Sequence, residues 1–224
     1  MGAITTTSPV IPKFRHGACN EPRTAHRYAM KLRRVGVAWL FLTALAFPSR
    51  AMWMMYETEL VPLREGMTRV DLVDANAGIA FDLDSSGAQR RWGWITTNAA
   101  WLVCDHDDRG KIASGLQMFG NVTFWIFWRD GFHALSSLDD DGDGSLSGPE
   151  LRHLAFWQDR NGNGISEPGE VTPVTEQDVI AIDCRSEAHS SGIQFNEHGL
   201  TFRHGRTRAT YDWIAASTPR GDGN

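Results

Sequence analysis

The sequence predicts an α+β domain in which two Asp- and Gly-rich loops share one short helix, with short β-strands around them. Residues 139–150 and 159–170 have the spacing of two twelve-residue loops. Residues 150–157 carry apolar side chains at helical spacing, so one helix would leave the first loop and enter the second. Residues 192–213 alternate apolar and polar side chains, and Gly205 marks the turn of a C-terminal β-hairpin.

The chain of 224 residues, 42% of them hydrophobic, is long enough for one globular domain and a short appendage. Its net charge of -5 is unevenly spread, because residues 1–51 hold eight of the 22 Lys and Arg residues but only Glu21 of the 27 acidic ones. A basic start is typical of a nucleic-acid-binding arm or of a targeting segment. The order of the residues favours the second.

A secretory signal peptide is predicted at residues 30–51. The basic stretch 30–34 precedes the apolar run 35–47, and the small residues Ser49 and Ala51 stand three and one residues before a cleavage point. We therefore predict cleavage after Ala51 and a secreted or periplasmic protein. A membrane anchor is the alternative, but the apolar run is shorter than the roughly 20 residues of a membrane span.

The signal needs nothing upstream, so we take Met30 as the translation start and Met1 as the alternative. We expect no nucleic-acid partner and no stable membrane span after cleavage. The predicted divisions are a misassigned upstream extension, the signal peptide, a leading segment, one domain that holds both loops and the C-terminal strands, and a flexible tail, at residues 1–29, 30–51, 52–77, 78–215 and 216–224.

Cleavage would remove Cys19 and leave Cys104 and Cys184 in an oxidising compartment. A disulfide between these two cysteines is one hypothesis, and two buried free thiols are the other. Aromatic side chains crowd residues 92–132, where a hydrophobic core is favoured over a carbohydrate-binding platform. A short helix is predicted at residues 131–138.

The first loop, DDDGDGSLSGPE at 139–150, has the pattern of a calcium site. An EF-hand-type loop offers about six to eight oxygens to calcium from its positions 1, 3, 5, 7, 9 and 12, and glycine at position 6 permits the sharp turn. The alternative is an acidic, solvated turn. The predicted ligands are Asp139, Asp141, Asp143, the Ser145 carbonyl, Ser147 through water, and Glu150.

The second loop, DRNGNGISEPGE at 159–170, is a less regular copy. It has amides at positions 3 and 5, and an apolar residue at position 7 instead of position 8, so the β-bridge that normally pairs such loops is not expected. Since affinity follows ligand charge, the first loop should bind more tightly. The predicted ligands are Asp159, Asn161, Asn163, the Ile165 carbonyl, Glu170 and, as a further candidate, Glu167.

One helix shared by both loops leaves no room for the groove opening of calcium sensors, so the sequence favours structural calcium over signalling. Two fainter copies lie upstream, at FDLDSSG (81–87) and at CDHDDRGKIASGLQMFG (104–120). In the second copy Arg109 occupies position 5, and Gln117 stands near the expected acid. Whether the loop at Asp105 binds calcium is left open.

The order of these motifs, covering roughly residues 78–171, resembles the EF-hand-like modules of large secreted bacterial haemolysin-type (RTX) proteins. This resemblance implies export and calcium binding. Some such modules are similar to self-processing domains that cut an Asp-Pro bond with calcium, but none of the nine prolines here follows Asp. A degenerate self-processing module is therefore a minor alternative.

Catalysis is not predicted, because the H-E-x-x-H, G-x-S-x-G and phosphate-loop patterns are missing from the sequence. The histidines do not have zinc-ligand spacing to a cysteine pair. We thus predict a calcium-binding, non-enzymatic exported protein whose calcium is mainly structural. The alternative is a calcium-dependent adhesion or assembly module, comparable to dockerins, with an unidentified extracytoplasmic protein partner.

Overall fold

The computed structural model describes residues 56–188 and 193–215. The predicted upstream extension 1–29, signal peptide 30–51 and tail 216–224 lie outside the described residues. Among the residues described, no helix reaches the length and hydrophobicity that a membrane crossing by a helix requires.

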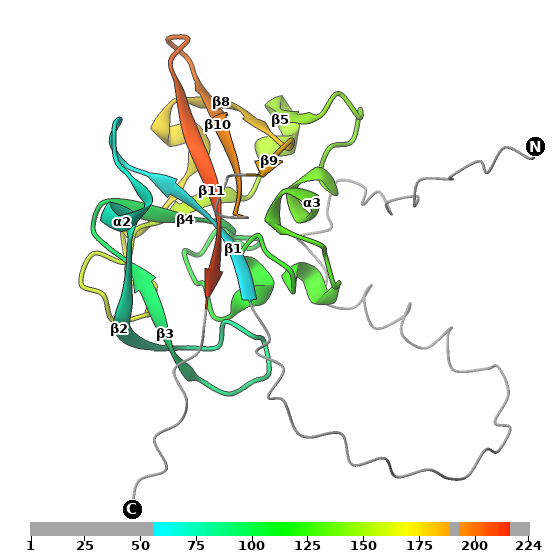
Figure 1. The fold of residues 1–224 in the computed structure, drawn as a ribbon. Coiled ribbons are helices and arrows are strands. Elements are labelled where there is room, and N and C mark those ends of the chain that lie inside the picture. The colour runs from blue at the N-terminus through cyan, green and yellow to red at the C-terminus, as the bar shows by residue number, and fades with distance from the viewer. Residues whose placement is uncertain (1–55, 189–192, 216–224) are drawn as a thin grey trace, which may run out of the picture.

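The regular secondary structure of the described residues is mainly β-strand, with two short α-helices (Figure 1). The helices are α2 (Arg69–Leu72) and α3 (Gly131–Ser136). The strands are β1 (Tyr56–Pro62), β2 (Val73–Phe81), β3 (Arg90–Ile95), β4 (Ala99–Cys104), β5 (Ser145–Ser147), β6 (Leu154–Trp157), β7 (Val171–Pro173), β8 (Val179–Asp183), β9 (Glu187–Ala188), β10 (Gln194–Phe202) and β11 (Thr207–Ala215).

One nine-stranded antiparallel sheet dominates the fold. Its strand order is β5-β8-β10-β11-β1-β4-β6-β7, and β9 adds to β10. Strands β2 and β3 form a separate two-stranded sheet, which lies on the opposite side of β1 from α3 in Figure 1. Leu146 of β5 and Phe156 of β6 share one hydrophobic cluster although their strands lie near opposite ends of the order, so the sheet curls.

Both faces of the large sheet are covered, because successive side chains of a strand point to opposite faces. In β4, Leu102 packs into the core that also holds α3, whereas Trp101 packs into a second core beside β2 and β3. This second cluster, the tryptophan core, contains Phe81, Trp92, Trp94, Trp101 and Trp157.

The aromatic segment 92–132 is therefore largely core, as predicted. Phe119 and Phe132 are also buried, whereas the side chains of Trp125 and Phe127 are 63% and 86% exposed. Helix α3 lies within the predicted 131–138, and β10 and β11 form the predicted hairpin with Gly205 at the turn (φ 75°).

The predicted α+β fold with a helix shared by two EF-hand-type loops is wrong. A 3-10 turn at Gly148–Leu151 is followed by β6, which pairs with β4 and β7. His153 has a φ of 66°, which a right-handed helix does not permit. All residues of β6 are buried, so the side chains of this short apolar run are covered on both faces of the sheet. Periodicity alone does not distinguish such a run from a buried helix.

Of the two hypotheses for Cys104 and Cys184, the disulfide between them is wrong, because Cys184 is a free and buried cysteine. Burial raises the pKa of the Cys184 thiol, and nearby carboxylates such as Asp139 add to the shift. The thiol therefore stays protonated and unreactive.

Two acidic side chains are buried where β1 pairs with β11. Glu59 is 0% and Asp212 is 2% exposed, and their Cα atoms are direct partners across the strands. Burial, with the nearby charges of Asp212 and Asp130, raises the pKa of Glu59 well above its usual range. Burial also raises the pKa of Asp212. The folded protein thus holds protons that the unfolded chain releases.

This buried pair makes the stability of the calcium-free protein depend on pH. A carboxyl group with a raised pKa stabilises the fold fully below its unfolded pKa of about 4, and that contribution is lost as pH rises toward the folded pKa. We expect the free energy of unfolding to fall over this range by up to about 1.4 kcal/mol per pH unit for each retained proton. Urea unfolding at several pH values in EGTA measures the slope.

The variant Glu59→Gln should show a flatter dependence, because the amide does not titrate. Glu197→Gln, an exposed change on β10, should keep the slope of the unaltered protein. Equal slopes in Glu59→Gln and the unaltered protein would contradict the assignment.

Candidate functional site

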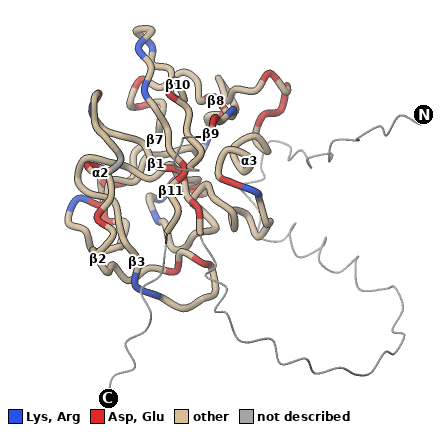
Figure 2. The backbone as a smooth tube through the Cα atoms, in the orientation of Figure 1, with Lys and Arg blue, Asp and Glu red and all other residues tan. Residues whose placement is uncertain are grey.

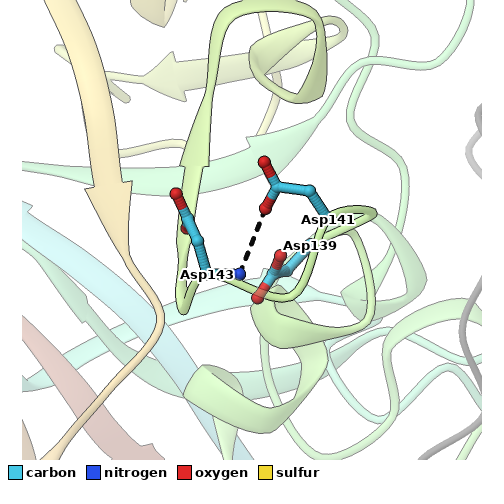
Figure 3. A group of neighbouring side chains, drawn as sticks. All are labelled: Asp139, Asp141 and Asp143. Carbon is cyan, nitrogen blue, oxygen red and sulfur yellow. Dashed lines mark hydrogen bonds between the residues drawn. The ribbon is translucent and has the colours of Figure 1, made fainter.

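The first acidic loop follows α3 and runs through β5 into the turn at Gly148–Leu151. Figure 2 shows acidic positions along this loop. Asp139, Asp141 and Asp143 each offer a carboxylate oxygen, and these oxygens lie within 4.8 Å of one another (Figure 3). Asp139 is buried, and the other two are exposed. The geometry therefore brings together the first three predicted ligands.

Backbone N–H groups hold these carboxylates in place. Asp139 accepts from Gly142 N–H and, at 2.9 Å, from Gly144 N–H. Asp141 accepts from Asp143 N–H at 3.1 Å, the bond drawn in Figure 3. Asp143 accepts from Ser145 N–H at 2.7 Å. Gly144 has a φ of 89°, which favours glycine at this turn.

Glu150 closes the first loop. Its carboxylate accepts from Asp140 N–H at 2.7 Å and from Ser147 N–H at 2.9 Å. Ser145 and Ser147, the other predicted ligands, are the two ends of β5. The side chain of Leu146 between them is fully buried and anchors the loop in the core.

The second loop repeats this hydrogen-bond pattern position by position. Asp159 accepts from Gly164 N–H at 2.7 Å, and Glu170 accepts from Arg160 and Glu167 N–H groups at 2.9 and 3.1 Å. Asn161 accepts from Asn163 N–H, and Asn163 accepts from Ile165 N–H. The two sequences thus fold into the same local turn.

The second loop carries less negative charge, because Asn161 and Asn163 stand where the first loop has aspartates. The side-chain NH₂ groups of Asn161 and Asn163 donate to Glu167 at 2.6 and 3.3 Å. Ile165 at position 7 is 57% exposed, whereas Ser166 at position 8 is buried. The apolar residue therefore points outward, and a hydroxyl takes the inward position.

The second loop is bonded to the tryptophan core. Asp159 is 2% exposed, and it accepts a hydrogen bond of 2.7 Å from the indole N–H of Trp94. Trp94 contacts Trp101 and Trp157, with ring centroids 5.3 and 5.7 Å apart. A buried charge on the loop thus lies directly against the core.

The two loops do not pair with each other. Leu146 of the first loop pairs with Ile182 of β8. In the second loop, the Ser166 hydroxyl accepts from the N–H of Ile112 at 2.9 Å, which links it to the upstream loop at Asp105. Strand β6 separates the loops along the chain.

The upstream copies have the same turn, but in each of them an arginine side chain forms an ion pair with one of the acidic residues. Gly110 N–H donates to Asp105 at 2.8 Å, and Gly87 N–H donates to Asp82 at 3.1 Å. In the Asp105 loop, Arg109 forms an ion pair with Asp107 at 3.4 Å. The carboxylate of Asp84 likewise pairs with Arg90 at 2.9 Å. An arginine therefore supplies positive charge to each upstream loop.

Sequence reasoning missed the contribution of Trp94 and the buried acids of β1 and β11. The tryptophan lies far from Asp159 in the chain, so the sequence carries no local signal for their contact. Glu59 follows Glu57 and Thr58 in β1, so the local sequence does not indicate its burial either.

Comparison with known proteins places this fold in a family. A family model for the SPM domain matches residues 65–214. Iron-regulated protein FrpA of Neisseria meningitidis serogroup C is 31% identical over 112 residues, which are 48% of this chain and 10% of FrpA. The chain thus spans about a tenth of the length of this relative.

These findings correct the resemblance inferred from the motifs. The identification as an EF-hand-like module of RTX proteins is wrong, because the SPM-domain match covers the region and the fold is a curled β-sheet. The name of FrpA says nothing of calcium or export. Since the SPM-domain match covers more than half of the length of this chain, the chain belongs to the SPM domain family.

Proposed function

We propose that loops 139–150 and 159–170 bind calcium and that the bound ions stabilise the β-fold. The observation that supports this most strongly is the shared turn, in which five equivalent hydrogen bonds orient the side chains at positions 1, 3, 5 and 12. Two loops of different sequence thus present oxygen atoms in the same way.

Calcium fits these loops better than magnesium or zinc. It accepts many oxygen ligands in flexible geometry, whereas magnesium needs a near-ideal octahedron and zinc favours Cys and His. The first loop has carboxylates at positions 1, 3, 5 and 12, and the second has them at 1 and 12, with Glu167 at position 9. The first loop should therefore bind more tightly.

A stabilising role follows from burial and charge. Asp139 and Asp159 are 7% and 2% exposed, and neighbouring carboxylates repel one another when no cation lies between them. A cation that binds only the folded loops shifts the folding equilibrium by mass action. The absence of catalysis and an exported location stay predictions.

Calcium should raise the melting temperature of the full chain. At calcium about 100-fold above its dissociation constant, one site adds about 2.7 kcal/mol, or roughly 5–10 °C for a domain of this size. Melting followed by circular dichroism, in EGTA and then in excess calcium, measures the shift.

Two matched variants distinguish the loops in the same experiment. Glu150→Gln should remove more of the calcium-dependent gain than Glu170→Gln, because it disables the more highly charged loop. A melting temperature that is the same in EGTA and in calcium would disprove the proposal.

Arg109 should keep calcium out of the upstream loop. The variant Arg109→Asp removes the internal cation and places a carboxylate at position 5 beside Asp105 and Asp107, so we expect one more bound calcium per chain by calorimetry. Arg206→Asp, in the exposed hairpin turn, is the charge-matched control. An unchanged number of bound calcium ions in Arg109→Asp would show that Arg109 is not what prevents this loop from binding calcium.

A further inference from the structure

A second group of acidic residues lies away from both loops, where β1 and β11 meet the segment before α3. A pocket of about 120 Å³ opens there. Its lining residues are Glu57, Arg129, Asp130, Gln194, Asp212 and Ile214. A water molecule occupies about 30 Å³ of liquid volume, so the pocket has room for an ion with some of its water.

Several carboxylate oxygens at this place are buried without a hydrogen-bond partner among the described residues. One oxygen of Asp212 accepts from Gly131 N–H at 2.9 Å, and the other, Oδ1, has no partner. Both oxygens of Glu59 and the Oε2 atom of Glu57 are also unpartnered. Asp212 and Glu59 are 2% and 0% exposed, so bulk water does not solvate them. Buried polar atoms of this kind need a ligand, water or a proton.

These carboxylates converge because of strand register. Glu59 stands directly across from Asp212, and Glu57 lies two residues before Glu59, on the same face of β1. Gly131 lies next to both Glu59 and Asp212. Its N–H donates to Asp212, and a Cβ atom at Gly131 would lie 3.1 Å from Glu59 Oε1.

The arginine that lines the pocket does not neutralise these carboxylates. Arg129 lines the pocket, but its side chain is 73% exposed and its guanidinium pairs with Asp130 at 3.1 Å. Asp130 also accepts from the N–H and the ring of His133. Asp130 is therefore satisfied, whereas Glu57, Glu59 and Asp212 have no positive partner within the described residues.

We propose that this pocket binds one hard divalent cation through Glu57 and Asp212, with the carboxyl group of Glu59 beside them. The donors available are carboxylate oxygens, which calcium and magnesium prefer over zinc. This site is separate from the loops, and its pocket lies between the central strand pair and the segment before α3.

Calorimetric titration of the full chain with calcium alone, and then with magnesium alone, tests the proposal. The variant Glu150→Gln/Glu170→Gln weakens both loops, and it should retain one binding event. Adding Asp212→Asn should weaken that event by about tenfold or more, and Glu197→Gln should leave it unchanged. Circular dichroism checks that each variant is folded.

Glu57→Gln gives a second route if Asp212→Asn does not fold, because Glu57 is only half-buried, and it too should weaken the event by about tenfold. A folded loop variant that binds neither cation, or an event unaffected by Asp212→Asn or by Glu57→Gln, would overturn the proposal. Failure of the loop proposal looks different, since Glu150→Gln and Glu170→Gln would then leave the number of bound ions unchanged in the otherwise unaltered chain.

Discussion

The hydrogen bond from Trp94 to Asp159 links the candidate metal site to the core of the protein. Its donor lies among packed tryptophans from β3, β4 and β6, and its acceptor is position 1 of the second loop. A negative charge buried beside aromatic rings is costly unless it is compensated. The backbone N–H groups of the loop compensate part of this charge, and a cation would compensate more. Ion occupancy and core stability are therefore expected to be coupled.

The sequence predicted the loops better than their surroundings. Each loop depends on contacts within twelve residues, such as Asp139 with Gly144, so its shape follows from local spacing. The segment between the loops depends on distant strands instead. Leu154–Trp157 pairs with residues near 101–104 and 171–173, and those partners turn an apolar run with helical spacing into a strand. The hairpin of β10 and β11 was predictable because its turn and its alternation are local.

Charge distribution explains why four similar turns need not have one function. The upstream loops at Asp82 and Asp105 have arginine partners, whereas the clustered carboxylates of Asp139, Asp141 and Asp143 lie within 4.8 Å of one another. The sequence indicates Arg109 by its position in the loop. It does not indicate Arg90, which reaches Asp84 from the next strand. The buried acids at Glu59 and Asp212 are hidden for the same reason, because strand pairing alone brings them together.

Terbium luminescence tests the coupling of loop and core most directly. Terbium replaces calcium at oxygen sites and emits when an excited tryptophan lies close by, as Trp94 does at Asp159. We expect sensitised emission that calcium displaces, with a marked loss of emission in Trp94→Phe at an unchanged number of bound ions. A folded protein without sensitised emission, or emission that Asp159→Asn leaves intact, would contradict it.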